Sequence, residues 1–374
     1  MKKFTLILAT VALLAAGCSK TEVVGPQNRK GINFAAYTAK TTKALQEDVT
    51  TANLSEFKVT AFGNGAFYFN NLTFTKSDES NVWESATKYF WPAFPLTFYA
   101  YNTPSGYNTQ VQPTGFYIAP DRQTLEVTPA PQLAYQEDLV AAYAAAKTES
   151  DVENISKSLS LTFKHYLTQV IVTAKNARSN TYKVVVESVK IANMAGHGTY
   201  TFKTNTMEAP AGIKNNENSI DYTATFTAKT LESEAKEVMT DAGKGRWYLI
   251  PQDVTSWNPS TDINNTHNGT YLALKVKITA NNDALNIYPA DGTSGWMAVP
   301  IPSGLKFEQG KKYTVNINFF AKNGAGYVDP EAGSDLNGDG IANDNGKKII
   351  GGEIKFNATV DQWDNNNNNI DIYL

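Results

Sequence analysis

The chain has 374 residues, of which 42% are hydrophobic, 11% aromatic and 18% charged, and its formal net charge is −3. This composition is typical of a globular protein rather than a disordered one, and it lacks the basic excess that nucleic-acid binding requires. The length is sufficient for two domains, and the abundance of tyrosine and phenylalanine favours strands.

The first 17 residues have the features of a secretory signal peptide. Lys2 and Lys3 precede an apolar run over residues 4–16, which is shorter than the roughly 20 residues that a transmembrane helix needs. Small residues then lead to Cys18, the only cysteine of the chain, in the sequence LAAGC. This pattern resembles a lipobox and predicts cleavage before Cys18 and its modification with acyl chains such as palmitate. The alternative is an ordinary secretory signal whose cysteine is incidental.

Residues 18–30 are polar and are expected to form a tether that follows the signal peptide of residues 1–17. Arg29 and Lys30 make a dibasic pair at the end of this tether. A basic pair in an exposed segment is either a site of proteolytic processing or simply a solvated part of the tether.

From residue 31 onward, short alternating segments are separated by glycine, proline, asparagine and aspartate. This spacing is typical of antiparallel β-sandwiches, and it predicts an all-β protein. We expect an N-terminal sandwich over residues 31–155 and a C-terminal sandwich over residues 156–374, with the polar residues 148–156 at the boundary. Strands are expected over residues 32–34, 57–62, 67–70, 96–101, 159–163, 169–174, 182–191, 247–250, 271–278, 313–320 and 354–360.

The alanine-rich residues 139–147 are ambiguous. Their intrinsic propensity favours a helix, which Asp138 is suited to cap. An alanine-rich edge strand is the other interpretation.

Residues 335–340, DLNGDG, match the first half of a calcium-binding loop. Asp335, Asn337 and Asp339 supply oxygen atoms at the first, third and fifth positions, and glycine follows at the sixth. The twelfth position is Gly346, so the bidentate carboxylate of an EF-hand is missing. The loop is therefore a candidate Ca²⁺ site or a polar hairpin loop. We expect no other cofactor.

The last residues form a candidate strand. Ile370, Ile372 and Leu374 alternate with polar or aromatic residues after the polar linker of residues 364–369. This segment suits either a donor strand for a neighbouring molecule or the edge strand of its own sandwich.

Catalysis finds little support in the sequence. The three histidines are dispersed, and no metalloprotease, serine-hydrolase or phosphate-loop spacing occurs. His165 follows an apolar segment and is expected to be a core or edge residue. The six tryptophans are either core anchors or a platform for stacking sugars. The chain is therefore expected not to be an enzyme.

A series of short motifs runs in order along nearly the whole mature chain. They are residues 31–34 (GINF), 57–62 (FKVTAF), 89–92 (YFWP), 96–101 (LTFYAY), 137–141 (EDLVA), 159–165 (LSLTFKH), 249–252 (LIPQ), 310–313 (GKKY) and 354–356 (IKF), with Trp363 after them. Together these motifs resemble those of the fimbrillin family of Bacteroidales outer-membrane lipoproteins.

The resemblance implies two consecutive transthyretin-like antiparallel β-sandwiches after a lipoprotein signal peptide. It implies a fimbrial (pilus) subunit, or an accessory tip or anchor fimbrillin, on the surface of the outer membrane, with a role in adhesion. It also implies assembly by β-strand exchange after proteolytic removal of an N-terminal segment behind a basic residue.

The partners implied by the resemblance are other fimbrial subunits, the outer membrane through the lipid, and a host or bacterial surface ligand. No nucleic-acid partner is expected. The alternative is a monomeric surface lipoprotein that binds glycans.

Overall fold

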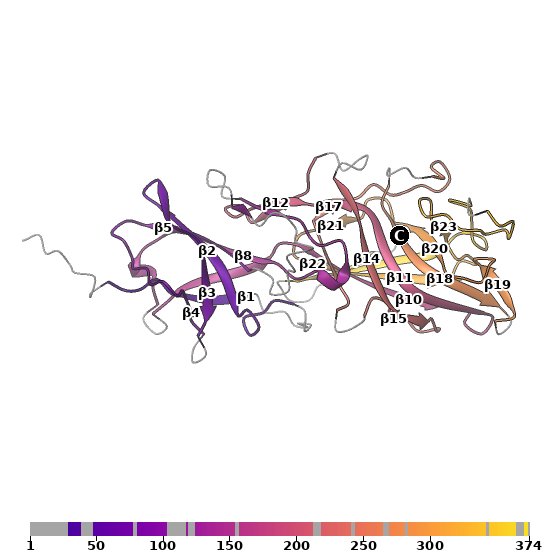
Figure 1. Ribbon diagram of the computed structural model, residues 1–374, viewed down its shortest axis with the longest axis horizontal. Helices are drawn as coiled ribbons and strands as arrows, with labels where there is room; N and C mark the ends of the chain where they lie inside the picture. The colour runs from indigo at the N-terminus through magenta and orange to yellow at the C-terminus, as the bar shows by residue number, and fades with distance from the viewer. Residues whose placement is uncertain are drawn as a thin grey trace, which may run out of the picture.

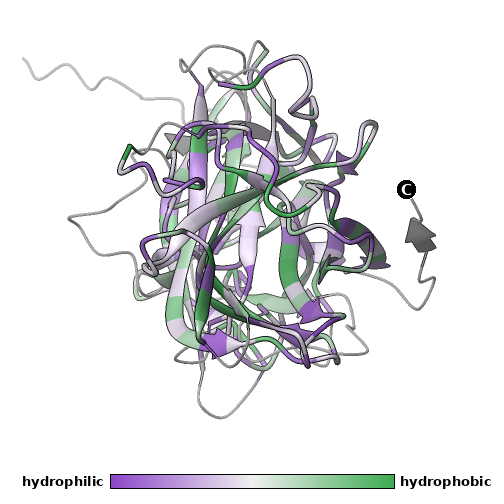
Figure 2. Ribbon diagram, turned by 90° about the vertical axis from the view of Figure 1, so that its right-hand side faces the viewer, coloured by the Kyte–Doolittle hydropathy of each residue, from purple (hydrophilic) through white to green (hydrophobic). Residues whose placement is uncertain are grey.

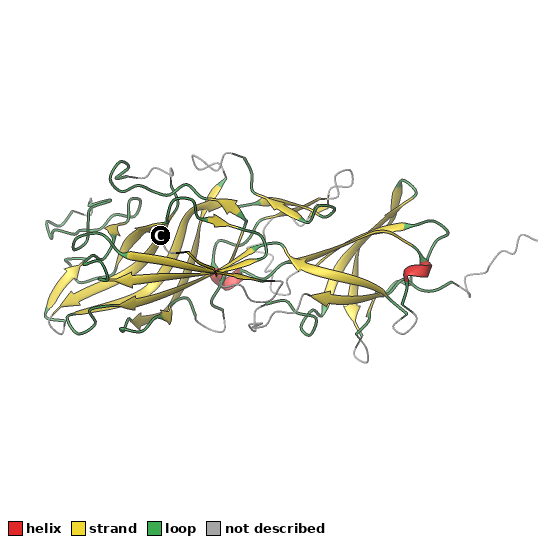
Figure 3. Cartoon of the chain, turned by 180° about the vertical axis from the view of Figure 1, so that it is seen from behind, coloured by secondary structure: helices red, strands yellow, loops and turns green. Residues whose placement is uncertain are grey.

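A computed structural model describes most of the chain after the signal peptide. The described ranges are residues 29–38, 48–77, 81–102, 117–118, 124–153, 157–211, 218–240, 244–264, 269–280, 283–341, 344–363 and 370–372. Within them the structure consists almost entirely of strands and loops, with two short 3-10 turns and no α-helix (Figure 3). The prediction of an all-β protein is confirmed. None of the described residues belongs to a helix that is long and apolar enough to span a membrane.

The N-terminal half forms one sheet that closes on itself, seen at the left of Figure 1. Closure occurs at the first strand, which pairs antiparallel with one neighbour and parallel with the last strand of the sheet. In sheet order the strands are β1 (Phe34–Thr38), β4 (Trp83–Glu84), β3 (Ala66–Lys76), β2 (Glu56–Gly63), β5 (Leu96–Tyr101), β8 (Val140–Lys147) and β9 (Leu159–His165).

Phenylalanine rings fill the interior of this closed sheet. The ring of Phe34 lies 4.7 Å from that of Phe74 and 5.2 Å from that of Phe98, in edge-to-face geometry. Phe57 and Phe163 approach to 4.9 Å, and all five side chains are fully buried. Since side chains alternate along a strand, every second residue of these segments reaches the interior, as the sequence pattern predicts.

The C-terminal half contains two larger sheets (Figure 1). The first has the order β15 (Lys236–Glu237), β10 (Thr168–Asn176), β22 (Lys311–Phe319), β24 (Lys355–Gln362) and β25 (Ile370–Ile372), with β16 (Trp247–Leu249) also paired to β10. The second has the order β14 (Ser219–Thr230), β11 (Tyr182–Ala195), β18 (Tyr271–Ala280), β20 (Gly295–Pro300) and β23 (Tyr327–Val328), with β19 (Leu285–Tyr288) paired to β18.

These two sheets enclose one hydrophobic core. Val172 of β10 and Ile317 of β22 share it with Val189 of β11, Leu274 of β18 and Met297 of β20. Hydrophobic and hydrophilic residues alternate along parts of the strands (Figure 2), and one face of each sheet packs into this core. Each fully buried side chain of this size contributes about 1.5–3 kcal/mol to folding. Two sheets packed in this way form a β-sandwich. The opposite face of the second sheet carries a smaller buried cluster that includes Tyr271, Ala273 and Ala298.

Smaller sheets lie near the junction of the two halves. In the four-stranded one, β7 from the first half of the chain pairs with β12 from the second, so this sheet links them. Its strands are β13 (Thr206–Glu208), β12 (Gly198–Thr201), β7 (Thr124–Val127) and β6 (Tyr117–Ile118). A two-stranded sheet pairs β17 (Gln252–Asp253) with β21 (Lys306–Phe307). The two 3-10 turns are η2 (Leu133–Tyr135) and η3 (Glu149–Asp151).

The structure resolves whether residues 139–147 form a helix or a strand. They form strand β8 rather than a helix, and β8 is not an edge strand, because it pairs with β5 on one side and with β9 at Val140 and Ala141 on the other. Pairing with two neighbouring strands outweighs the helix propensity of the alanines, because propensity is a small term that tertiary context overrides.

The domain limits and the transthyretin-like topology stay predictions. Strand β9 pairs with β1 of the N-terminal sheet, so strand pairing favours a division after His165 rather than between residues 155 and 156.

Candidate assembly site

The last described strand, β25, lies at the edge of the sheet that contains β24. Ile370 stands opposite Val360 and Ile372 opposite Ala358 in an antiparallel pair of three register positions. On its other side β24 pairs with β22 over eight positions. Val360 and Ala358 belong to the C-terminal core, so the edge that β25 covers adjoins buried apolar side chains. Leu374 lies outside the described residues.

Arg29 and Lys30 are exposed at the start of the described chain. The backbone is fastened immediately afterwards. The N–H of Trp91 donates to the carbonyl of Lys30 at 3.2 Å, and the N–H of Ile32 donates to the carbonyl of Tyr89 at 2.8 Å. A peptide bond between the two basic residues therefore borders a segment that the N-terminal sheet holds in place. Cys18 lies before the described residues.

A cluster of buried or largely buried polar residues, with one tryptophan, joins the two halves of the molecule. We call it the junction cluster, and its members are Asp48, Asp138, His165, Gln169, Lys312 and Trp363. The Asp48 carboxylate is fully buried and accepts hydrogen bonds from Gln169 Nε2 at 2.6 Å and from Lys312 Nζ at 2.7 Å. Asp48 belongs to the N-terminal half, whereas Gln169 and Lys312 lie on β10 and β22 of the C-terminal sandwich.

The second carboxylate of the junction cluster is paired with histidine. His165 Nδ1 lies 2.9 Å from Asp138 Oδ2 and 3.0 Å from Oδ1, and the N–H of Val49 donates to Oδ2 at 2.7 Å. Burial raises the pKa of the Asp138 carboxyl, whereas the neighbouring His165 opposes this rise. The pair is thus held within the protein and is placed to stabilise it rather than to act on a substrate.

Trp363 completes the junction cluster from the C-terminal side. Its ring stacks on the imidazole of His165 with centroids 4.1 Å apart, and Lys312 Nζ lies 5.4 Å from its centroid. Five of the six tryptophans are at most 2% exposed, namely Trp83, Trp91, Trp247, Trp257 and Trp363. These five therefore serve as core anchors. Trp296 alone of the six is partly exposed.

The candidate calcium loop is closed by its own hydrogen bonds. The carboxylate of Asp335 accepts from the N–H of Gly338 at 2.7 Å and from the N–H of Gly340 at 2.9 Å. Asn337 Nδ2 donates to Asp339 Oδ2 at 3.0 Å, and Asn337 Oδ1 accepts from the N–H of Asp339 at 3.1 Å. These bonds are those of successive polar turns. Calcium binding at this loop stays a prediction.

Asp344, at the tenth position of the loop, is buried and its carboxylate bonds to the protein. Its carboxylate accepts from the N–H of Leu336 at 2.7 Å and pairs with Lys347. In the part of the chain that the structure describes, no three His, Cys, Asp or Glu side chains are grouped so as to hold a metal ion.

The structure does not bring the histidines together as far as it describes them. His165 belongs to the junction cluster, as a buried residue, and His197 is half-buried beside β12. His267 lies outside the described residues. Sequence reasoning missed the junction cluster, although Asp138 and His165 are polar residues of two of the quoted motifs, EDLVA and LSLTFKH.

Several solved structures are similar to this chain at low sequence identity, and the one with a TM-score above 0.5 shares its fold. A fimbrial protein from Bacteroides vulgatus ATCC 8482 is 16% identical over 90% of this chain and 100% of its own, with a TM-score of 0.54. A protein assigned to cell adhesion from Bacteroides uniformis ATCC 8492 is 14% identical over 90% and 99% of the two chains, with a TM-score of 0.45. The fimbrial anchor protein Mfa2 from Porphyromonas gingivalis is 10% identical over 78% and 90%, with a TM-score of 0.35.

A search of curated proteins gives no match. The family model described as fimbrillin-like matches residues 21–331. This match spans both halves of the molecule, including the junction cluster up to Lys312 and most strands of the two sandwich sheets. The chain belongs to the fimbrillin-like family.

Proposed function

We propose that this fimbrillin-like chain is a subunit of a cell-surface fimbrium that joins its neighbours by β-strand exchange and contributes to adhesion. The observation that carries the proposal is strand β25, a short strand at a sheet edge, held by three register positions and bordered by the C-terminal core. Fimbrillins are structural proteins, so family membership agrees with the prediction that the chain is not an enzyme.

Delivery to the surface begins with the lipid in this proposal. The signal peptide exports the chain, and acyl chains on Cys18 hold it in the outer membrane, since each buried CH₂ contributes about 0.8 kcal/mol. Cleavage between Arg29 and Lys30 then separates the subunit from its anchor. The hydrogen bonds of Lys30 and Ile32 to residues 89–91 keep β1 in place after the cut.

Strand exchange follows from the chemistry of a sheet edge. If β25 leaves β24, the N–H and C=O groups at the edge of β24 lose their partners beside the apolar side chains of Val360 and Ala358. An extended segment of a second subunit restores the hydrogen bonds and covers these side chains. In the isolated monomer β25 fills this position itself.

The test compares three forms of the mature protein: uncleaved, cleaved at Arg29, and cleaved with residues 370–374 deleted. We expect filaments in electron micrographs only from the cleaved, undeleted form, and a folded monomer from the deleted form by circular dichroism. An Arg29→Ala, Lys30→Ala variant is the control that resists cleavage. Unfolding of the C-terminal half upon deletion, or filaments without residues 370–374, would contradict the donor role.

The fate of the anchor decides the place of the subunit in the fimbrium. A subunit that loses Cys18 by cleavage extends the shaft or forms the tip, whereas one that keeps it roots the fimbrium in the membrane. N-terminal sequencing of the assembled protein distinguishes the two.

The second candidate function, a monomeric glycan-binding surface lipoprotein, is favoured by the partial exposure of Trp296. Purified protein that binds polysaccharides and never forms filaments would support it.

A further inference from the structure

The outer face of the β14-β11-β18-β20 sheet is interrupted where strand β11 bulges. Val186 and Ser188 of β11 pair with consecutive residues of β18, which leaves Glu187 as an extra residue. Against β14, the same two residues pair with Lys229 and Thr225, so three residues of β14 lie between the paired positions where β11 has only Glu187. A bulge of this kind bends the strand and turns side chains out of the regular pleat, and such bulges are frequent beside binding sites.

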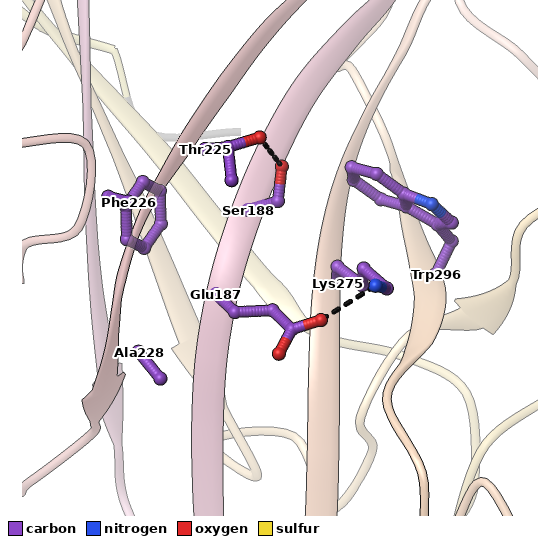
Figure 4. Close-up of a pocket in the computed structure, with 7 residues that line it drawn as sticks. All are labelled: Glu187, Ser188, Thr225, Phe226, Ala228, Lys275 and Trp296. Atoms are coloured by element: carbon purple, nitrogen blue, oxygen red, sulfur yellow. Dashed lines mark hydrogen bonds and ion pairs between the residues drawn. The ribbon is translucent and has the colours of Figure 1, made fainter.

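A hollow of about 390 Å³ opens at this bulge. Its volume lies within the range of small-molecule pockets, roughly 300–1,000 Å³. Figure 4 shows that the side chains surround the space from four strands: Glu187 and Ser188 from β11, Thr225, Phe226 and Ala228 from β14, Lys275 from β18 and Trp296 from β20.

Two groups of opposite charge stand together in the hollow. Glu187 Oε1 lies 2.7 Å from Lys275 Nζ, and the two side chains are 34% and 38% exposed. Because this pair is neutral as a whole, it does not select an ionic ligand. It nevertheless leaves the second carboxylate oxygen and further ammonium hydrogens for a ligand with both donors and acceptors. The hydroxyls of Ser188 and Thr225 add further polar groups at 3.3 Å from each other.

Trp296 supplies an aromatic surface that has a buried ammonium group beside it. The Nζ atom of buried Lys190 lies 5.4 Å from the ring centroid of Trp296 and 5.4 Å from that of Tyr271. Lys190 is held in turn by Asp329 at 3.0 Å and Asp221 at 3.5 Å. An ammonium group over an aromatic ring stabilises the ring's placement by about 0.5–2 kcal/mol. This contact favours the observed placement of the Trp296 ring at the hollow.

We infer that this hollow, which we call the bulge pocket, binds one sugar unit of a neutral glycan. A sugar ring offers an apolar C–H face for Trp296 and hydroxyl groups for Glu187 and Lys275. A wholly apolar ligand would bury the ion pair without hydrogen bonds, which is costly, and a charged ligand gains no net attraction from a neutral pair. The inference rests on the adhesive role proposed above and assigns to it a class of ligand.

The test is a glycan array that carries neutral, sialylated and sulfated glycans, probed with the labelled mature protein. We expect retention on neutral glycans and a loss of about tenfold or more in affinity for the Trp296→Ala variant, equivalent to about 1.4 kcal/mol. Glu187→Gln keeps the volume of the side chain and is expected to weaken binding as well. Circular dichroism confirms that each variant is folded.

The matched control is Phe67→Ala, which removes an exposed aromatic side chain, 37% exposed, from strand β3 of the other half. Its glycan binding is expected to equal that of the unchanged protein. Equal binding by Trp296→Ala and Glu187→Gln, binding to charged glycans alone, or no retained glycan would each overturn the inference. The Trp296→Ala variant is expected to form filaments normally, so failure of glycan binding and failure of strand exchange give different results.

Discussion

Replacing Lys312 with methionine is expected to destabilise the protein strongly. Methionine has a similar length and fits beside Trp363, so the change removes the charge with little loss of packing. What remains is the Asp48 carboxylate, which is fully buried and no longer faces an ammonium group at 2.7 Å. Breaking a buried ion pair from one side is costly because the other charge stays buried.

The magnitude follows from the contact distance and from burial. Two unit charges at the observed 2.7 Å attract by about 6 kcal/mol at an effective dielectric constant of about 20. Part of this attraction is offset because the mutation also removes the cost of dehydrating Lys312, whose side chain is 14% exposed. We therefore expect the free energy of unfolding to fall by about 3 kcal/mol, at the lower end of the range for broken buried pairs.

Urea denaturation followed by tryptophan fluorescence measures this loss. With an m value of about 3 kcal/mol/M, the expected shift of the midpoint is about 1 M. The control is Lys306→Met, because Lys306 pairs with Asp253 at 3.0 Å but both side chains are well exposed, at 61% and 74%. That variant is expected to lose about 0–1 kcal/mol.

A double-mutant cycle separates the pair from its surroundings. Asp48→Asn combined with Lys312→Met removes both charges, so the double variant is expected to be more stable than the sum of the single losses implies. If Lys312→Met loses no more than Lys306→Met, or if the two single losses add without coupling, the reasoning about the junction cluster is wrong.

Three further predictions concern other parts of the chain. Cys18→Ser is expected to abolish incorporation of labelled palmitate and release the protein from membranes; unchanged labelling would rule out Cys18 as the lipid site. Burial raises the pKa of Tyr101 from 10.0 to about 12, so its phenol ionises in the unfolded chain before it does in the folded protein. The stability that neutral Tyr101 confers is thus complete below pH 10, and the free energy of unfolding declines toward pH 12 by up to about 1.4 kcal/mol per pH unit. In urea titrations at several pH values, Tyr101→Phe is expected to reduce this decline. If the loop at Asp335 binds calcium, millimolar calcium raises the melting temperature relative to chelator in the unchanged protein but not in Asp335→Ala; equal melting temperatures would exclude the site.

Much of the strand pattern was predictable because it depends on neighbouring residues. Alternation at Phe57, Val59 and Ala61 is visible within one segment, and all three are buried in the N-terminal core. Strand β14 was missed because its alternating residues, such as Tyr222 and Ala224, lie among threonines that give a weak contrast. The alanine-rich strand β8 was ambiguous because propensity alone decides little where two neighbouring strands bury a segment.

The junction cluster and the bulge pocket were not predictable from the sequence. Asp48 and Lys312 stand 264 residues apart, and a lone aspartate or lysine gives no sign of its partner. The bulge at Glu187 depends on the register of β11 against two neighbours, which alternation within β11 does not determine. Both features arise from pairings between distant strands, and no local pattern encodes them.

The parallel pairing of β1 with β9 has a mechanical consequence for a filament under tension. The register runs from Phe34 opposite Leu159 to Thr38 opposite Phe163. In a subunit that is not cleaved at Arg29 and keeps its lipid anchor, a pull on the chain before β1 and an opposite pull on the chain after β9 act along the strands, so all the hydrogen bonds between them are strained together instead of opening one after another. After β9 only Tyr166 and Leu167, both fully buried, precede β10. A stretching force thus passes from the N-terminal sheet into the C-terminal sandwich through a connection of only these two buried residues.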